Sequence, residues 1–176
     1  MELFATLLLA HLLADFPLQT DWMFRVKVRH WAGVVLHAAM HVLVTAALIQ
    51  QPLTYWPVLL ILWAVHSLID WLKLYIQFKY ISVGFVLDQI AHTLTLAMIA
   101  YQVPAIMGGI QPEIVPWLIT WAMIPAVFMF LSILAVDVDQ AAPGRVRWSK
   151  QNQTFKLISQ ISGYPLLAAV LIFRLI

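Results

Sequence analysis

The sequence is organised as long apolar segments separated by short polar connections. Six such segments lie at residues 3–18, 32–49, 55–77, 83–101, 114–136 and 157–176. A helix needs about 20 mostly apolar residues to cross the hydrocarbon core of a bilayer. The pattern therefore predicts an all-α, polytopic integral membrane protein with about six transmembrane helices.

The composition supports this interpretation. The chain has 176 residues, of which 63% are hydrophobic and 10% are charged, whereas soluble domains average about 25% charged residues. Such a chain has too little charge to cover a water-facing surface and too much apolar surface for intrinsic disorder. It contains no cysteine, which excludes disulfides, iron–sulfur clusters and thiolate metal ligands.

Basic residues are concentrated around the connections that follow the first, third and fifth segments. Nine of the ten lysines and arginines lie there: Arg25, Lys27, Arg29, Lys73, Lys79, Arg145, Arg147, Lys150 and Lys156. Because basic connections tend to remain in the cytoplasm, we expect both termini to lie outside. We attribute this charge to topology and to contact with anionic membrane lipids, and we expect no nucleic-acid partner.

Each of the first four segments contains two ionisable side chains spaced four residues apart. The pairs are His11 and Asp15, His37 and His41, His66 and Asp70, and Asp88 and His92. This spacing puts both members of a pair on one face of a helix. Combined with the predicted topology, it places all eight at similar depth in the cytoplasmic half of the bilayer, with His11, His41, His66 and His92 as the deeper layer.

We therefore expect residues 1–102 to form a four-helix core around an intramembrane His/Asp cluster. Residues 103–176 would add two buttressing transmembrane helices and a basic cytoplasmic loop to the same single domain. An aspartate at the centre of a membrane helix costs roughly 2.5–3.5 kcal/mol, so three aspartates need compensation. Hydrogen bonds between histidine and aspartate, a proton relay, or a bound metal would each provide it.

Metal binding is the favoured explanation. Neutral imidazole and carboxylate are the ligands expected for Zn²⁺, and also for Mn²⁺ or Fe. Three carboxylates would nearly balance the charge of two divalent ions. The sequence therefore predicts a site for one or two divalent ions, with zinc as the first choice.

Four motifs occur in order along the first hundred residues: HLLADFPLQTDWM at 11–23, LHAAMH at 36–41, HSLIDWLK at 66–73 and LDQIAH at 87–92. They resemble the small bacterial inner-membrane proteins of the domain-of-unknown-function family thirty-three-oh-seven. More distantly, the chain resembles the YdjM-like membrane-bound metal-dependent hydrolases, which are grouped with zinc phospholipase C. The resemblance implies a helical metal site, phosphoester hydrolysis and a location in the bacterial inner membrane.

The same motifs contain four further polar residues that would support ligands or contact a substrate: Gln19, Asp21, Lys73 and Gln89. Asp21 equally fits an interfacial carboxylate at a helix end. Lys73 would pair with a carboxylate, hold a substrate phosphate, or extend to lipid headgroups.

Several functions remain open at this point. A metallohydrolase would act on a lipid or isoprenoid phosphate from the cytoplasmic leaflet, with Asp15, Asp70 or Asp88 as its catalytic base rather than as a ligand. A metal-ion or proton transporter would also need polar groups in the outer half, where the first four segments offer mainly threonines. The sequence does not contain the histidine clusters that are usual in di-iron oxygenases, and haem binding would leave the three aspartates unexplained. A structural or partner-binding role is a further alternative. The oligomeric state is not specified by the sequence.

Overall fold

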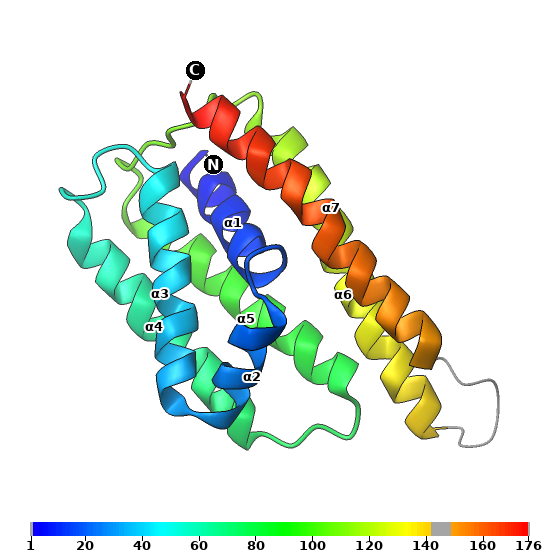
Figure 1. Cartoon of the computed structure of the whole chain (residues 1–176). Helices are drawn as coiled ribbons and strands as arrows, with labels where there is room; N and C mark the ends of the chain where they lie inside the picture. Colours follow the sequence, from blue (N-terminus) through cyan, green and yellow to red (C-terminus); the bar gives the residue numbers. More distant parts are fainter. Residues whose placement is uncertain (1, 142–148, 176) are drawn as a thin grey trace.

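A computed structural model of the chain describes residues 2–141 and 149–175, with the side chains of the second range described from Asn152 onward. These residues form seven α-helices and no strand (Figure 1). The helices are α1 (Glu2–Asp15), α2 (Asp21–Arg29), α3 (Trp31–Leu48), α4 (Trp56–Tyr75), α5 (Ile81–Gln102), α6 (Val115–Ala141) and α7 (Ser149–Leu175). The all-α fold predicted from the apolar pattern is confirmed.

Five helices, α3 to α7, are long and apolar enough to cross a membrane. Large apolar side chains are widely exposed on them, as expected for helices that face lipid. The chain is therefore compatible with a multi-pass membrane protein. The first predicted span differs, because α1 has 14 residues and a length of only about 21 Å, against about 30 Å for the hydrocarbon core.

The short helix α1 is the central element of the bundle. Its apolar residues are spread around the helix, and it packs against α3, α5 and α6. Leu9 and Leu13 are almost completely buried, and Leu3 and Leu7 are 4% exposed. A helix without a polar face is usually buried among its neighbours. The neighbouring helices therefore cover α1, although it is shorter than the hydrocarbon core.

Helix α2 occupies the connection that was expected to link the first two spans. Its N-terminus is capped by Thr20, whose Oγ1 accepts a hydrogen bond from the Met23 backbone N–H at 3.3 Å. It then folds back against α3, where a Cβ atom on Gly33 would overlap the backbone of Val26 and Lys27. Met23 and Lys27, four residues apart, are the two buried residues of α2.

The N-terminal end of α1 and the C-terminal end of α7 lie at the same end of the bundle (Figure 1). Glu2 Oε1 accepts a hydrogen bond from the Gly108 N–H at 3.3 Å, and Arg174 Nε donates one to the Ala47 carbonyl at 2.8 Å. We call this the terminal end.

The opposite end, which we call the basic end, contains α2 and the connection between α4 and α5. The basic residues described there are Arg25, Lys27, Arg29, Lys73, Lys79 and Lys156. Of the other three assigned to this side from the sequence, Arg145 and Arg147 lie outside the described residues, as does the side chain of Lys150. The connections that were predicted to share one face of the membrane thus share one end of the bundle, as far as they are described.

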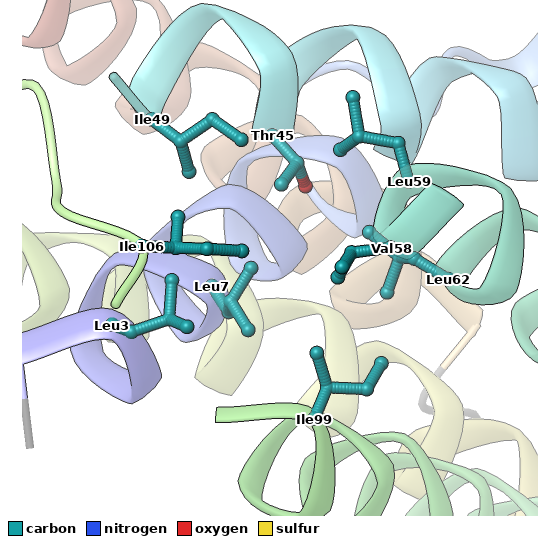
Figure 2. A pocket seen from close by; sticks show the side chains of 9 residues that line it. All are labelled: Leu3, Leu7, Thr45, Ile49, Val58, Leu59, Leu62, Ile99 and Ile106. Atoms are coloured by element: carbon teal, nitrogen blue, oxygen red, sulfur yellow. The ribbon is translucent and has the colours of Figure 1, made fainter. Parts of the chain in front are cut away.

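Between the terminal end and the middle of the bundle, α1, α3, α4 and α5 pack through apolar side chains. Figure 2 shows the small gap that remains there, which has a volume of about 10 Å³ and is lined by leucine, isoleucine and valine side chains with Thr45. A space of this size holds at most about one water molecule. The side chains that line this gap are therefore closely packed.

Helices α6 and α7 form a long pair that lies against the rest of the bundle (Figure 1). Ser159 Oγ donates a hydrogen bond to the Pro125 carbonyl at 2.7 Å, and Ser132 Oγ donates one to Asn152 Oδ1 at 2.6 Å. Asp137 of α6 accepts hydrogen bonds from the Ile81 and Ser82 backbone N–H groups at 2.8 and 2.7 Å. It thereby caps the N-terminus of α5 and joins the pair to the core.

Gly33→Ala tests the close contact between α2 and α3. Alanine is usually better than glycine inside a helix by about 1 kcal/mol, but here the added Cβ would meet backbone atoms of α2. We expect a loss of about 1–3 kcal/mol, the usual range for overpacking, seen as a lower midpoint in thermal unfolding of the purified protein in detergent. Ala32→Ser, at the exposed neighbouring position, should change the midpoint little. A Gly33→Ala protein that is more stable than the wild type would contradict the contact.

Candidate metal centre

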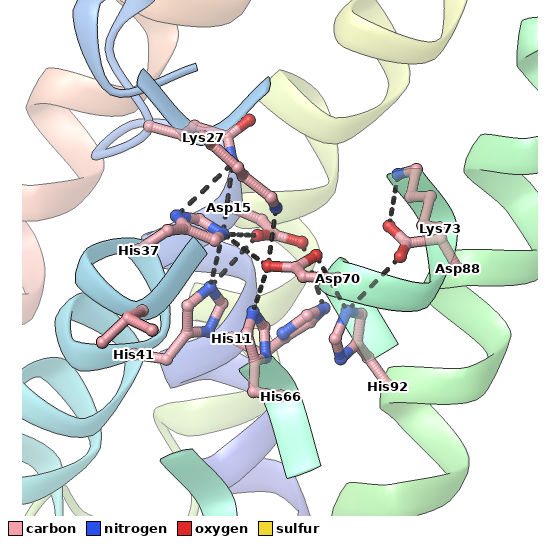
Figure 3. Close-up of polar contacts among 12 residues, drawn as sticks. His11, Asp15, Lys27, His37, His41, His66, Asp70, Lys73, Asp88 and His92 are labelled. Carbon is pink, nitrogen blue, oxygen red and sulfur yellow. Dashed lines mark hydrogen bonds and ion pairs between the residues drawn. The ribbon is translucent and has the colours of Figure 1, made fainter. Parts of the chain in front are cut away.

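The eight side chains predicted as ligands meet between four helices, beside Lys27 and Lys73 (Figure 3). Helix α1 contributes His11 and Asp15, α3 His37 and His41, α4 His66 and Asp70, and α5 Asp88 and His92. None of them is more than 8% exposed. Each i, i+4 pair points inward because both members lie on one helix face, so the four helices direct eight potential ligands into one interior.

The four histidines expected in the deeper layer have neighbouring rings. The His66 ring lies between those of His41 and His92, with centroid distances of 3.7 and 4.1 Å. The His11 ring lies 5.1 Å from each of the same two rings. The rings of these four residues, which come from four different helices, therefore adjoin one another.

Asp15, His37 and His41 form a first group of candidate ligands. The Nε2 atoms of His37 and His41 lie 3.0 and 3.1 Å from Asp15 Oδ1 and 3.2 Å from each other. Ligand atoms at about 2.1 Å from a tetrahedral ion lie about 3.4 Å apart, so this triangle has nearly the size that one ion requires. His66 also places a ring nitrogen within 4.8 Å of these atoms.

Asp70, Asp88 and His92 form a second group. His92 Nε2 lies 3.6 Å from Asp70 Oδ1 and 3.5 Å from Asp88 Oδ1, again close to the spacing of ligands around one ion. All three atoms are buried, and none of them has a hydrogen-bond partner among the described residues. Each unsatisfied buried polar atom costs about 1–3 kcal/mol, and beyond the two contacts with His92 these atoms have no hydrogen-bond partner among the described residues.

The two groups adjoin each other. His37 Nε2 of the first group lies 3.8 Å from Asp70 Oδ2 of the second. His11, His66 and His92 also place ring nitrogens within 4.8 Å of one another, which links the groups through the histidine layer. Each of the two groups could therefore hold a metal ion.

Three of the four supporting residues predicted from the motifs contact the candidate ligands. Gln89 Nε2 donates a hydrogen bond to Asp15 Oδ2 at 2.8 Å, and Gln19 Nε2 lies 3.2 Å from His37 Nε2. Lys73 Nζ donates one to Asp88 Oδ2 at 2.6 Å. Such contacts hold ligands in a fixed orientation.

Asp21 is the predicted residue that the structure places elsewhere. Its Oδ1 lies 2.7 Å from Lys156 Nζ and accepts a hydrogen bond from Gln160 Nε2 at 3.1 Å. The hydrogen bond from Lys156 holds the pKa of the Asp21 carboxyl below its usual range. Asp21 therefore joins α2 to α7, which agrees with the alternative of an interfacial carboxylate at a helix end.

Lys27 belongs to the cluster, although the sequence suggested only a topological role for it. Its Nζ lies 2.7 Å from Asp70 Oδ2, and its side chain is 11% exposed. Figure 3 shows it entering the cluster from the side opposite the histidine layer. The signal that would have revealed it is the spacing from Met23, since the two residues share the buried face of α2.

Comparison with known proteins gives one family. The family described as Protein of unknown function (DUF3307) matches residues 3–118, which include every candidate ligand named above. No curated protein and no solved structure matches the chain. Because the match covers more than half of the chain, the protein belongs to the DUF3307 family.

Proposed function

We propose that this protein is an intramembrane metalloprotein that hydrolyses a phosphate ester with the help of one or two divalent ions. The observation that carries the proposal is the set of buried atoms on Asp70, Asp88 and His92 that converge without a hydrogen bond, beside the closely spaced triangle of Asp15, His37 and His41. A divalent ion in either group would satisfy several of these atoms at once.

The donor set favours zinc. Imidazole nitrogens and carboxylate oxygens without a thiolate suit Zn²⁺, and also Mn²⁺ and Fe. The distances of 3.0–3.2 Å in the first group fit the short bonds of these ions better than Ca²⁺, whose oxygen ligands lie at about 2.3–2.6 Å.

The charge balance favours an anionic substrate. The three aspartates contribute three negative charges, and Lys27 and Lys73 contribute two positive charges to the same cluster. One divalent ion would leave a net charge of about plus one, and two ions about plus three. A buried positive charge needs a partner, and a phosphate ester supplies one.

The chemistry follows from these groups. A divalent ion would polarise the phosphoryl oxygen and lower the pKa of a nearby water molecule. In the reaction, the water oxygen bonds to phosphorus, the phosphorus–oxygen ester bond breaks, and the departing alkoxide takes up a proton. Asp15 is already held by His37, His41 and Gln89 and acts as a ligand. Asp70 belongs to the second group but also reaches the first, since its Oδ2 lies 3.8 Å from His37 Nε2. With an ion in the first group alone, the Oδ1 of Asp70 would be free to accept the water proton and to return it to the departing alkoxide.

A transport function has less support. The cluster does not continue toward the terminal end, where the gap between α1, α3, α4 and α5 is apolar and about 10 Å³ in volume. An ion would have to leave its ligands for a gap whose lining offers one polar side chain, the hydroxyl of Thr45.

His41→Gln and His92→Gln test the metal centre, one in each group. We expect each to weaken the binding of Zn²⁺ by at least 10–100-fold, the effect typical of losing even a supporting residue. Elemental analysis and zinc titration of the purified protein measure this. His30→Gln is the matched control, because His30 is exposed and outside the cluster.

The same variants test the reaction. Phosphate release from a long-chain alkyl phosphate should follow metal content, so that it is lost in His41→Gln and His92→Gln and kept in His30→Gln. A wild-type protein that binds no divalent ion at neutral pH would overturn the proposal. Ion uptake into proteoliposomes without phosphate release would replace the hydrolase with a transporter.

Lys27→Met tests the charge balance. It removes the ion-pair partner of Asp70, and breaking a buried pair costs about 3–5 kcal/mol, so the variant should unfold at a lower temperature without added metal. Zn²⁺ should raise the midpoint of the variant more than that of the wild type, because the cluster has become more negative. Thermal unfolding with and without Zn²⁺ measures both effects. Lys79→Met, which changes an exposed lysine, should respond to Zn²⁺ like the wild type. If Zn²⁺ raised the midpoint equally in the wild type and in both variants, Lys27 would not contribute to the charge balance of the cluster.

The orientation in the inner membrane is also part of the proposal. The basic end should face the cytoplasm and both termini the outside. Because the chain has no cysteine, Gln102→Cys gives a single thiol at the C-terminal end of α5, and Lys79→Cys gives one in the connection just before its N-terminal end. A membrane-impermeant thiol reagent should label Gln102→Cys in spheroplasts, and Lys79→Cys only after lysis. The reverse pattern would show that the protein is inverted.

A further inference from the structure

A groove opens on the outside of the bundle beside the candidate metal centre. It lies between the C-terminal part of α4 and the N-terminal part of α5, with a volume of about 210 Å³. Its apolar lining includes Leu72, Ile76, Phe78, Leu87 and Ala91. Leu72, Ile76 and Leu87 are 44–54% exposed, so the groove is accessible from the surface that α4 and α5 turn toward lipid.

Two charged residues connect this groove with the cluster. Lys73 and Asp88 belong to its lining, and their side chains form an ion pair at 2.6 Å. The other carboxylate oxygen of Asp88 faces His92 Nε2 at 3.5 Å. Asp88 therefore forms the boundary between the groove and the second ligand group, with one oxygen on each side.

Lys73 is suited to bind an anion when the metal centre is loaded. Its side chain is 34% exposed, whereas that of Asp88 is 5% exposed, so the ammonium group is accessible from the groove. When Asp88 shares its charge with a divalent ion, it holds Lys73 less strongly, and the positive charge of Lys73 becomes available to a phosphate group.

We propose that the α4–α5 groove binds the hydrocarbon chain of a single-chain lipid monophosphate and that Lys73 binds its phosphate beside the metal centre. This inference rests on the proposed function and names the substrate class for it. The apolar lining selects against a free water-soluble phosphate, and Lys73 selects against an uncharged lipid. The volume lies below the roughly 300–1,000 Å³ of drug-sized pockets, which favours one chain over two.

The position of the groove agrees with this substrate. Lys73 lies in the last turn of α4, at the basic end, and lysine side chains near helix ends reach the headgroup region. A lipid phosphate held there would keep its headgroup at the depth of the membrane interface while its chain follows the apolar groove. Only the phosphate would have to move inward toward Asp88.

The test uses the full-length protein in detergent with Zn²⁺ and a hexadecyl phosphonate that carries a photoreactive diazirine in its chain. A phosphonate cannot be hydrolysed at this position, so labelling reports binding alone. Mass spectrometry should locate the label on Leu72, Ile76 and Leu87. Unlabelled hexadecyl phosphate should compete for the site, and hexadecanol should compete at least tenfold less well.

Ala91→Trp should block the groove and reduce this labelling about tenfold or more, which corresponds to about 1.4 kcal/mol of lost binding. Ala97→Trp is the matched control, since Ala97 is an exposed residue of the same helix outside the groove. Gly84→Ala is a second blocking variant, because its Cβ would lie 2.6 Å from the Phe78 ring and displace it.

The outcomes separate this inference from the proposed function. If Zn²⁺ binds and methyl phosphate is hydrolysed, but the label spreads evenly over the exposed helices, the groove proposal is wrong and the metal centre stands. Equal competition by hexadecanol would also overturn it, since Lys73 would then play no part. If no metal binds, the proposed function fails, and labelling that still depends on the phosphonate group would show a lipid phosphate site without catalysis.

Discussion

Three carboxylates lie in the interior of this bundle, where water cannot solvate them, and the packing of the first five helices provides their partners. Asp15 is surrounded by His37, His41 and Gln89, Asp70 is paired with Lys27, and Asp88 with Lys73. These partners come from four different helices. Because an unpaired buried charge is strongly destabilising, any alternative packing that separated these residues would be penalised.

Much of the core and of the candidate site could be predicted from the sequence because two simple periodicities specify it. Apolar segments of membrane length locate α3 to α7, and the i, i+4 pairs identify which face of each helix turns inward. The position of each residue along its span then predicts that His11, His41, His66 and His92 lie at a similar depth. These inferences need only the rise of a helix and the direction of each span.

The features that could not be predicted depend on tertiary contacts. Lys27 looks like a topological charge in the sequence, and only the packing of α2 against Gly33 carries it to Asp70. Asp137 caps α5, which lies more than fifty residues earlier in the chain. The role of α1 as an enclosed helix follows from its neighbours, since its composition alone resembles that of a lipid-facing span.

The enclosure of α1 has a consequence for how the protein is made. With 14 residues, α1 is too short to be released stably into lipid by itself, and its neighbours α3, α5 and α6 emerge from the ribosome later. At about 5–20 residues per second, the chain needs several seconds or more before α5 is complete. In a chain that inserts as it is made, contact of His11 and Asp15 with hydrocarbon would be unfavourable during this interval. We therefore expect α1 to stay with the insertion machinery or at the membrane surface until its partners are complete.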